Sequence, residues 1–224
     1  MTYPTVGMRG LRAYARWWLP RHVASASIEG LENLPKSGPV LIAARHYHHL
    51  IDGAVLLARL PRPVHIIVAL DWVRDRSQRR RMERVCRWAR WPVIVRPSAA
   101  NVSASYPGDE GARTLRSGLR DALALLREGR VVAIFPEGYP AVDRPERLAS
   151  APERDEAGFL PFAAGFRIVA ARAARASANL SIVPMGFAYV RTGAGWSVRA
   201  RLGAPLPASA SVETVERAVR DLSQ

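Results

Sequence analysis

Apolar and polar positions follow two different periodicities along the chain. Short, continuous apolar runs have the length and composition of buried β-strands at 39–44, 64–70, 92–95, 131–135 and 181–187. Residues 196–203 alternate polar and apolar side chains, which is typical of a more exposed strand. Amphipathic stretches between these runs predict helices at about 8–19, 52–60, 77–90, 111–128, 159–175 and 211–222.

Strands that alternate with helices favour an α/β fold. This pattern is typical of a mainly parallel central sheet flanked by helices. A length of 224 residues suits a single domain with one substantial core, and we find no internal repeat. We therefore predict an amphipathic N-terminal helical segment over residues 1–29, followed by one α/β domain over residues 30–224. We expect the least ordered stretches at 98–110 and 140–157, which are rich in Pro, Ser, Ala and charged residues.

The formal net charge of +14 is large for this length, and nearly all of it comes from arginine, since Lys36 is the only lysine. Such a surface favours anionic partners, which include nucleic acid, acidic lipid headgroups and phosphorylated small molecules. The arginines are spread along the chain and no nucleic-acid-binding motif is present. We therefore expect no nucleic-acid partner.

Cys86 is the only cysteine, which excludes an internal disulfide and a paired-cysteine zinc site. Three arginines, Arg9, Arg12 and Arg16, interrupt what would be the apolar core of a signal peptide. No uncharged apolar stretch reaches the length of about 18 residues that crosses a bilayer. We expect a cytoplasmic protein that is peripheral on the inner face of the cell membrane.

Two of the predicted helices are unusually basic. In helix 8–19 the three arginines lie on one face, while Tyr14 and Trp18 lie on others. Helix 77–90 carries six arginines around an apolar stripe, which consists of Met82, Val85, Trp88 and Ala89. Either both helices simply pack on the sheet, or they lie in a membrane interface, where Trp and Arg suit the headgroup level. We favour the interfacial interpretation mainly for the N-terminal helix.

The segment "ARHYHHLIDG" (44–53) contains three histidines and follows the first buried strand. Ligand-facing residues in open α/β sheets collect at such strand ends. A histidine here could remove a proton from a substrate hydroxyl, and Asp52 could orient it and stabilise the imidazolium. Asp52 could instead be a first-turn aspartate favoured by the helix dipole, or a metal ligand together with His48. A metal site is less favoured because the remaining histidines complete no obvious ligand set.

Two further strand ends carry charged residues. The strand 131–135 runs into Pro136, Glu137 and Gly138, so a carboxylate lies where it could bind a hydroxyl or a polar headgroup. The strand 92–95 ends on Arg96, whose guanidinium could hold a phosphate with two hydrogen bonds. Each of these is also the ordinary exit of a strand into a turn.

Taken in order, these segments resemble the glycerolipid acyltransferase family, which contains the 1-acylglycerol-3-phosphate acyltransferases. The four blocks of that family correspond here to "HYHHLID" (46–52), "PVIVR" (92–96), "FPEG" (135–138) and "IVPMGF" (182–187). The stretch "FLPFAAGFRIVAARA" (159–173) also resembles the family's helix between the third and fourth blocks. The resemblance covers about residues 30 to 205, and it implies a glycerol-3-phosphate acyltransferase-like fold.

The first block departs from the family pattern of His, four residues and Asp, because position 47 is Tyr47. Counting forward from the strand places the catalytic histidine at His46, one residue further from Asp52 than usual. Counting back from Asp52 points to His48, which is one residue too close. We assign His46, since the strand fixes its place and a turn can absorb one residue, with His48 as the alternative base.

The third block, "FPEG" and the residues after it, also departs from the family pattern. After the glycine the family often has an arginine that is thought to help bind phosphate, whereas this chain has Tyr139 and Pro140. Arg144 or Arg147 are the candidates that could supply the charge from the following loop. This departure leaves other acceptors than 1-acylglycerol-3-phosphate open.

The resemblance implies transfer of a fatty acyl group from acyl-CoA or acyl carrier protein to a hydroxyl of a lysophospholipid such as 1-acylglycerol-3-phosphate. It implies His46 as the base, Asp52 as its orienting carboxylate, no acyl-enzyme, and no metal or other cofactor. The residues expected to bind the acceptor are Arg96, Phe135, Pro136, Glu137 and Gly138. An anionic membrane surface is the expected partner. Two alternatives stay open: an acyltransferase with a different lipid or glycolipid acceptor, and a non-catalytic membrane-binding protein of the same fold.

Overall fold

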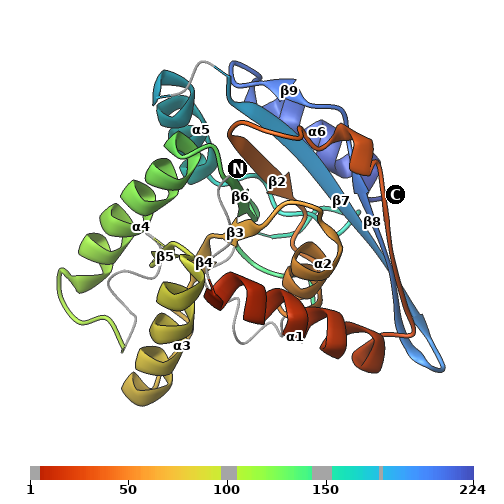
Figure 1. Cartoon of the computed structure of the whole chain (residues 1–224), viewed down its shortest axis with the longest axis horizontal. Helices are drawn as coiled ribbons and strands as arrows, with labels where there is room; N and C mark the ends of the chain where they lie inside the picture. The colour runs from red at the N-terminus through yellow and green to blue at the C-terminus, as the bar shows by residue number, and fades with distance from the viewer. Residues whose placement is uncertain (1–5, 97–104, 143–152, 177–178) are drawn as a thin grey trace.

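A computed structural model describes residues 6–96, 105–142, 153–176 and 179–224. Its centre is a seven-stranded sheet with the order β1-β8-β7-β2-β6-β3, and β9 lies beside β7 (Figure 1). The strands are β1 (Ser25–Glu29), β2 (Val40–Ala44), β3 (Val64–Ile66), β6 (Val131–Ile134), β7 (Ser181–Thr192), β8 (Gly195–Leu202) and β9 (Leu206–Pro207). A separate two-stranded sheet joins β4 (Val68–Ala69) to β5 (Val93–Ile94).

The pairing is mainly parallel, as the sequence predicts. Strand β2 is parallel to both of its neighbours, β6 and β7, and the pairs β3–β6 and β1–β8 are parallel too. Antiparallel pairing is confined to β7, which pairs with β8 and β9 in this way. The carboxyl ends of β2, β3 and β6 therefore meet at one edge of the sheet.

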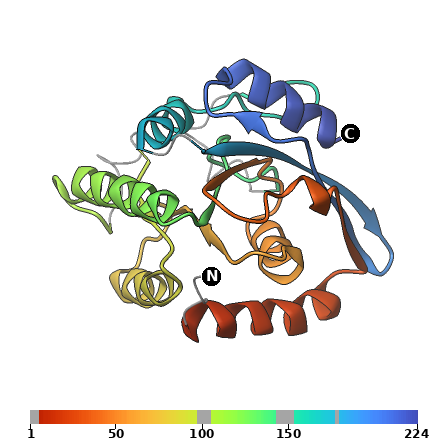
Figure 2. The same ribbon diagram turned by 45° about the horizontal axis from the view of Figure 1, so that its top comes forward.

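Helices cover both faces of the sheet (Figure 2). The helices are α1 (Val6–His22), α2 (Ile51–Arg59), α3 (Arg76–Ala89), α4 (Glu110–Arg127), α5 (Ala164–Ala176) and α6 (Val212–Leu222), with a short 3₁₀ turn at Leu31–Asn33. Side chains of β2 alternate between two cores: Val40 and Ile42 pack with α1 and α2, while Leu41 and Ala43 pack with α4, α5 and α6. Within the described residues, no helix is both long and apolar enough to cross a bilayer.

Three local predictions from the sequence were wrong. The run 64–70 is not one strand, because the chain changes partner: Ile67 N–H donates to Ala133 O, but Val68 N–H donates to Pro92 O. Residues 25–29, which we included in the helical N-terminal segment, form β1 and pair with β8 in the main sheet. Residues 159–163 precede helix α5 rather than opening it. The stretches expected to be least ordered, 98–110 and 140–157, lie partly outside the described residues, and Tyr106 in the described part is buried.

The single cysteine offers a probe of folding. Cys86 lies in α3, is 4% exposed, and burial raises the pKa of its thiol to about 12. Because the thiolate is the reactive form, we expect the native protein at pH 8 to react slowly with a thiol-specific disulfide reagent. One thiol per chain should become reactive when guanidinium unfolds the protein. Rapid labelling of the native protein would show that α3 does not pack as described.

Candidate active site

The first and third sequence blocks come together because β2 and β6 are parallel neighbours, with Ala43 paired to Ile134. The segments that follow these strands therefore leave the sheet side by side. They are joined by two backbone hydrogen bonds, from Ala141 N–H to His46 O and from Val142 N–H to Tyr47 O, each 3.0 Å. This places the histidine loop and the segment after "FPEG" in one site at the carboxyl edge of the sheet.

His46 and Asp52 form the predicted pair. The distance from His46 Nδ1 to Asp52 Oδ2 is 3.0 Å, and the Asp52 side chain is fully buried while that of His46 is 15% exposed. Because a carboxylate only accepts, this contact assigns the proton to Nδ1 and leaves the Nε2 lone pair of the neutral ring available. A ring held in this way is arranged as a general base.

The extra residue between His46 and Asp52 is absorbed by the turn before α2. The backbone N–H groups of Tyr47 and His48 donate to the same Asp52 oxygen, Oδ2, over 2.8 and 2.9 Å. The ring of His48 has a different place, because its Nδ1 accepts from the N–H groups of Leu50 and Ile51 at the start of α2. The geometry thus favours His46 over His48 as the residue that Asp52 orients.

Asp52 has a further partner that the sequence did not reveal. The hydroxyl of Tyr189, on β7, donates to Asp52 Oδ1. Burial and the negative charge of Asp52 raise the pKa of the Tyr189 hydroxyl, which therefore stays protonated and remains a donor. The ring of Tyr189 stacks on that of Tyr47 with centroids 4.2 Å apart. The alternation of side chains in β7 was the one available signal, since it places Tyr189 on the face that Val183, Met185 and Phe187 share.

The "FPEG" block holds the histidine loop through hydrogen bonds of Glu137. Glu137 Oε1 accepts from the backbone N–H of His46 over 2.9 Å, and Oε2 accepts from the N–H of Leu160 over 3.1 Å. Arg154 lies 3.6 Å from Oε2, a contact that no pattern in the sequence indicated. Burial raises the pKa of the Glu137 carboxyl, while the two N–H donors and the charges of Arg45 and Arg154 act in the opposite direction.

Glu137 was predicted to contact the acceptor. In the structure its side chain is fully buried, and both of its oxygens accept hydrogen bonds from backbone N–H groups. A group with this environment holds His46 in place rather than offering its oxygens to a ligand.

The sequence model of the Acyltransferase family matches residues 25–188. The chain belongs to the Acyltransferase family. The predicted resemblance to glycerolipid acyltransferases is thereby confirmed, and the match begins at β1, in agreement with the place of that strand in the main sheet.

A solved acyltransferase has a similar fold. The crystal structure of the 1-acyl-sn-glycerophosphate (LPA) acyltransferase PlsC from Thermotoga maritima superposes with a TM-score of 0.57 at 16% sequence identity. The superposition covers 96% of this chain and 77% of that one. It confirms the predicted α/β fold. No curated protein matches the sequence.

Arg96 of this acyltransferase is held within the protein. Its Nε and Nη2 atoms lie 2.8 and 2.7 Å from Asp71 Oδ2, and Nη1 donates to Gly138 O over 2.6 Å. Its guanidinium also stacks on the ring of Tyr139 at 3.7 Å. Gly138 has φ of +76°, a conformation that glycine adopts without strain, and this presents its carbonyl to Arg96. Arg96 thus fastens "FPEG" to the β4–β5 region, and its contact with a phosphate stays a prediction.

Phe135 and Pro136, the first two residues of "FPEG", pack against neighbouring segments of the site. The ring of Phe135 stacks on His46 with centroids 4.3 Å apart, so it fixes the plane of the imidazole. Pro136 is buried and its carbonyl accepts from Ala163 N–H. The candidates Arg144 and Arg147 lie outside the described residues. Among the residues that the structure does describe, no group of three or more His, Cys, Asp or Glu side chains could hold a metal ion.

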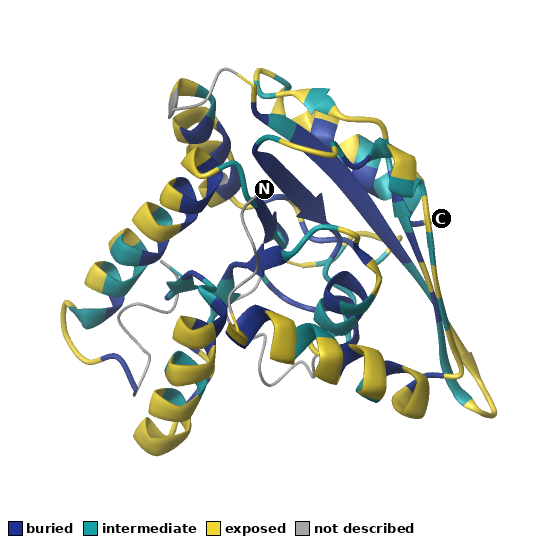
Figure 3. Ribbon diagram, in the orientation of Figure 1, coloured by how far each residue is buried: buried dark blue, intermediate teal, exposed yellow. Residues whose placement is uncertain are grey.

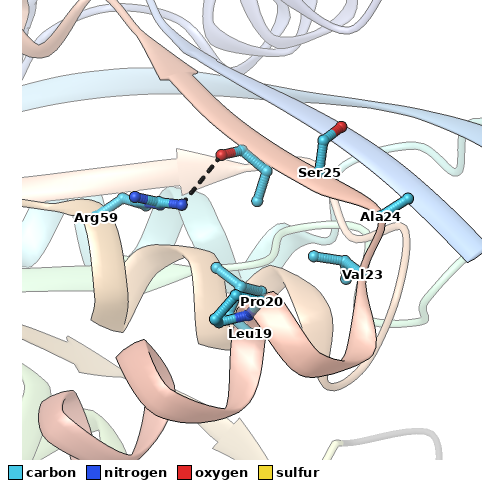
Figure 4. A pocket seen from close by; sticks show the side chains of 7 residues that line it. Leu19, Pro20, Val23, Ala24, Ser25 and Arg59 are labelled. Carbon is cyan, nitrogen blue, oxygen red and sulfur yellow. Dashed lines mark hydrogen bonds between the residues drawn. The ribbon is translucent and has the colours of Figure 1, made fainter.

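The crevice in Figure 4 lies away from this acyltransferase site. It has a volume of about 200 Å³ and lies between α1, β1 and the end of α2. Arg59 borders it and donates to Ala26 O over 3.3 Å. Asp52 is in the first turn of α2 and Arg59 in the last, so the crevice lies at the opposite end of that helix from the His46–Asp52 pair. We therefore do not place the reacting groups there.

Proposed function

We propose that this chain transfers a fatty acyl group from acyl-CoA or acyl carrier protein to a hydroxyl of a lysophospholipid, such as 1-acylglycerol-3-phosphate. The observation that carries the proposal is the His46–Asp52 pair, 3.0 Å apart at the carboxyl edge of the sheet in a member of the Acyltransferase family. This pair can activate a hydroxyl without a serine or cysteine nucleophile.

The proposed reaction has two proton transfers. His46 Nε2 takes the proton of the acceptor hydroxyl while the oxygen attacks the thioester carbonyl carbon. The buried Asp52 carboxylate stabilises the imidazolium that forms. The tetrahedral intermediate then breaks its C–S bond, and the imidazolium returns the proton to the departing sulfur. An ester and a free thiol result, and His46 is neutral again.

The test is acyl transfer by the purified protein with radiolabelled acyl-CoA or acyl carrier protein and a panel of lysolipids. We expect a radiolabelled diacyl product with at least one acceptor. Folded protein that gives no product with either donor and any acceptor would favour the non-catalytic membrane-binding alternative.

A different lipid or glycolipid acceptor is the second candidate, and the setting of Arg96 favours it. Its guanidinium already binds Asp71 and Gly138 O, and Pro140 occupies the second position after "FPEG", where related enzymes often have the arginine. The panel should therefore include monoacylglycerol and lysoglycolipids beside 1-acylglycerol-3-phosphate. A higher kcat/KM for an acceptor without phosphate would select this candidate.

We also propose that α1 and α3 bind an anionic membrane surface, which would place the protein on the inner face of the cell membrane. One side of α1 is exposed to solvent (Figure 3). Val6, Tyr14 and Trp17 of α1 are exposed, and α1 contains no acidic residue. Trp88 on α3 is exposed as well and lies against α1, where a Cβ at Gly7 would be 2.8 Å from its ring. The two helices are thus in contact and share one exposed surface, and their exposed arginines are Arg9, Arg16, Arg21, Arg76, Arg80, Arg81, Arg84 and Arg87. Such a surface suits anionic headgroups.

This membrane surface predicts binding that depends on lipid charge. In co-sedimentation, vesicles with phosphatidylglycerol should bind the protein at least about tenfold more tightly than vesicles of phosphatidylcholine alone, and added salt should weaken binding. The double variant W17S/W88S should bind less, because it loses two interfacial indoles. Val190→Ser, which removes an exposed apolar side chain from β7, is the control and should bind like wild type. Equal binding to both kinds of vesicle would contradict the proposal.

A further inference from the structure

The carboxylate of Asp52 is hydrogen-bonded on both of its oxygens. His46 Nδ1 and two backbone N–H groups reach Oδ2, whereas the hydroxyl of Tyr189 reaches Oδ1. The Oδ2 partners come from the loop directly before α2. Tyr189 is 137 residues away in sequence, so the sheet brings it to Asp52.

The extension of β7 explains this contact. Strand β7 pairs with β2 as far as Met185, opposite Ala44, where β2 ends. It then continues beside β8 alone, and Tyr189 pairs there with Val198. Because side chains alternate along a strand, Tyr189 lies on the same face as Met185, which is the face covered by α2. The overhanging end of β7 therefore places one hydroxyl over the first turn of α2.

The same aromatic side chain supports the loop that contains the additional residue. The ring of Tyr47 stacks on Tyr189 with an interplanar angle of 10°. Trp196 on β8 meets both rings edge-on, with centroids 5.9 Å from Tyr47 and 5.8 Å from Tyr189. Tyr47 also donates its N–H to Asp52. The loop that contains the additional residue and the aromatic cluster of Tyr47, Tyr189 and Trp196 therefore pack together as one structural unit.

We propose that Tyr189 is a positioning residue of the His46–Asp52 pair, and that it makes the longer His–Asp spacing of this chain compatible with general-base catalysis. Its hydroxyl fixes the rotamer of Asp52 and shares the negative charge of the carboxylate, while its ring holds Tyr47. A donor on Oδ1 draws charge away from Oδ2, so the carboxylate stabilises the His46 imidazolium less than it otherwise would. This inference rests on the proposed role of His46 as the base.

The test is Tyr189→Phe, which keeps the ring and removes the hydroxyl. Without this donor Asp52 carries more charge towards His46, so the ring should hold its proton to higher pH. We expect the acid limb of kcat/KM against pH to move up by roughly half a unit to one unit. The titration midpoint of the His46 ring, followed by NMR without substrate, should move in the same direction. We expect kcat at neutral pH to fall about tenfold, with KM for both substrates within about twofold.

Tyr106→Phe is the matched control, because Tyr106 is also buried and its hydroxyl also donates to a carboxylate, that of Glu83, at 3.0 Å. It should lower the melting temperature by a similar amount but leave the titration of His46 unchanged. The proposal is overturned if Tyr189→Phe titrates like wild type, whatever its kcat, because a merely structural role would give that result. A wild type without acyl transfer would contradict the proposed function instead, and the NMR titration would then still decide the role of Tyr189.

Discussion

Replacing His46 with alanine should lower kcat/KM for acyl transfer by about 10³-fold while the protein stays folded. The imidazole is the group whose Nε2 is free to accept a proton, since Nδ1 lies 3.0 Å from Asp52 Oδ2. Without it the acceptor hydroxyl must lose its proton to water, and the transition state loses the imidazolium–carboxylate pair. The loss should appear in kcat, because no contact with the ground state of the acceptor is assigned to this ring.

His48→Ala is the informative partner of that variant. The ring of His48 accepts the N–H groups of Leu50 and Ile51, so its removal should cost about 1 kcal/mol of stability, as the loss of a helix cap does. Its kcat/KM should stay within about tenfold of wild type. The reverse order, with His48→Ala inactive and His46→Ala active, would exchange the two assignments. Equal, small effects of both substitutions would remove the histidine loop from the mechanism.

The order of the secondary structure elements could be predicted from the sequence because it depends on local patterns. Apolar runs of four to seven residues and amphipathic stretches located the main strands and the six α-helices of the described residues, although the start of α5 and the end of β7 were each missed by five residues. The errors arose where tertiary pairing decides. No residue between 64 and 70 indicates that the hydrogen-bond partner of the chain changes from Ala133 to Pro92. Strand β1 was missed because its only apolar residues are Ala26 and Ile28.

In the candidate site, too, features set by local sequence could be predicted and features set by tertiary packing could not. His46 could be selected over His48 because a buried strand fixes the position of the residue that follows it, and the loop then absorbed the additional residue. The sequence could not show what the charged side chains contact. Arg96 is bound by Asp71, 25 residues earlier, and Glu137 binds the backbone of His46, 91 residues earlier. A strand end predicts that a residue lies near the site, but only packing decides whether it faces a ligand or supports a neighbour.

The role of Glu137 leads to the second large effect. Glu137→Gln should lower the free energy of unfolding by about 1–3 kcal/mol, because an amide cannot accept both N–H groups as the carboxylate does. One amide N–H₂ must face the N–H of His46 or of Leu160, and the guanidinium groups of Arg45 and Arg154 lose a nearby negative charge. A shift of the histidine loop should also lower kcat by about 10²-fold with little change in KM for the acceptor. Urea unfolding and steady-state kinetics measure the two effects.

Glu128→Gln is the control for stability, because Glu128 forms an exposed ion pair with Arg90. This substitution should lower the free energy of unfolding by less than about 1 kcal/mol. The pH dependence adds a second check. Burial raises the pKa of Glu137 in the folded protein, so its carboxyl contributes stability that is fully present below the unfolded pKa and is lost as pH rises through the folded pKa. Glutamine does not titrate. The difference in the free energy of unfolding between wild type and Glu137→Gln should therefore become smaller as pH rises from the unfolded pKa of Glu137 to its folded pKa.

The kinetic result separates the two roles considered for Glu137. If this carboxylate bound the acceptor directly, as the sequence first indicated, Glu137→Gln would raise KM for the acceptor, leave stability unchanged and affect acceptors with different headgroups unequally. If it holds the backbone of His46, every acceptor should lose the same factor in kcat, because all of them depend on one base. The full burial of Glu137 and its two backbone hydrogen bonds favour the second outcome. In that case "FPEG" contributes to catalysis by fixing the histidine, and the contacts that choose the acceptor lie elsewhere in the site.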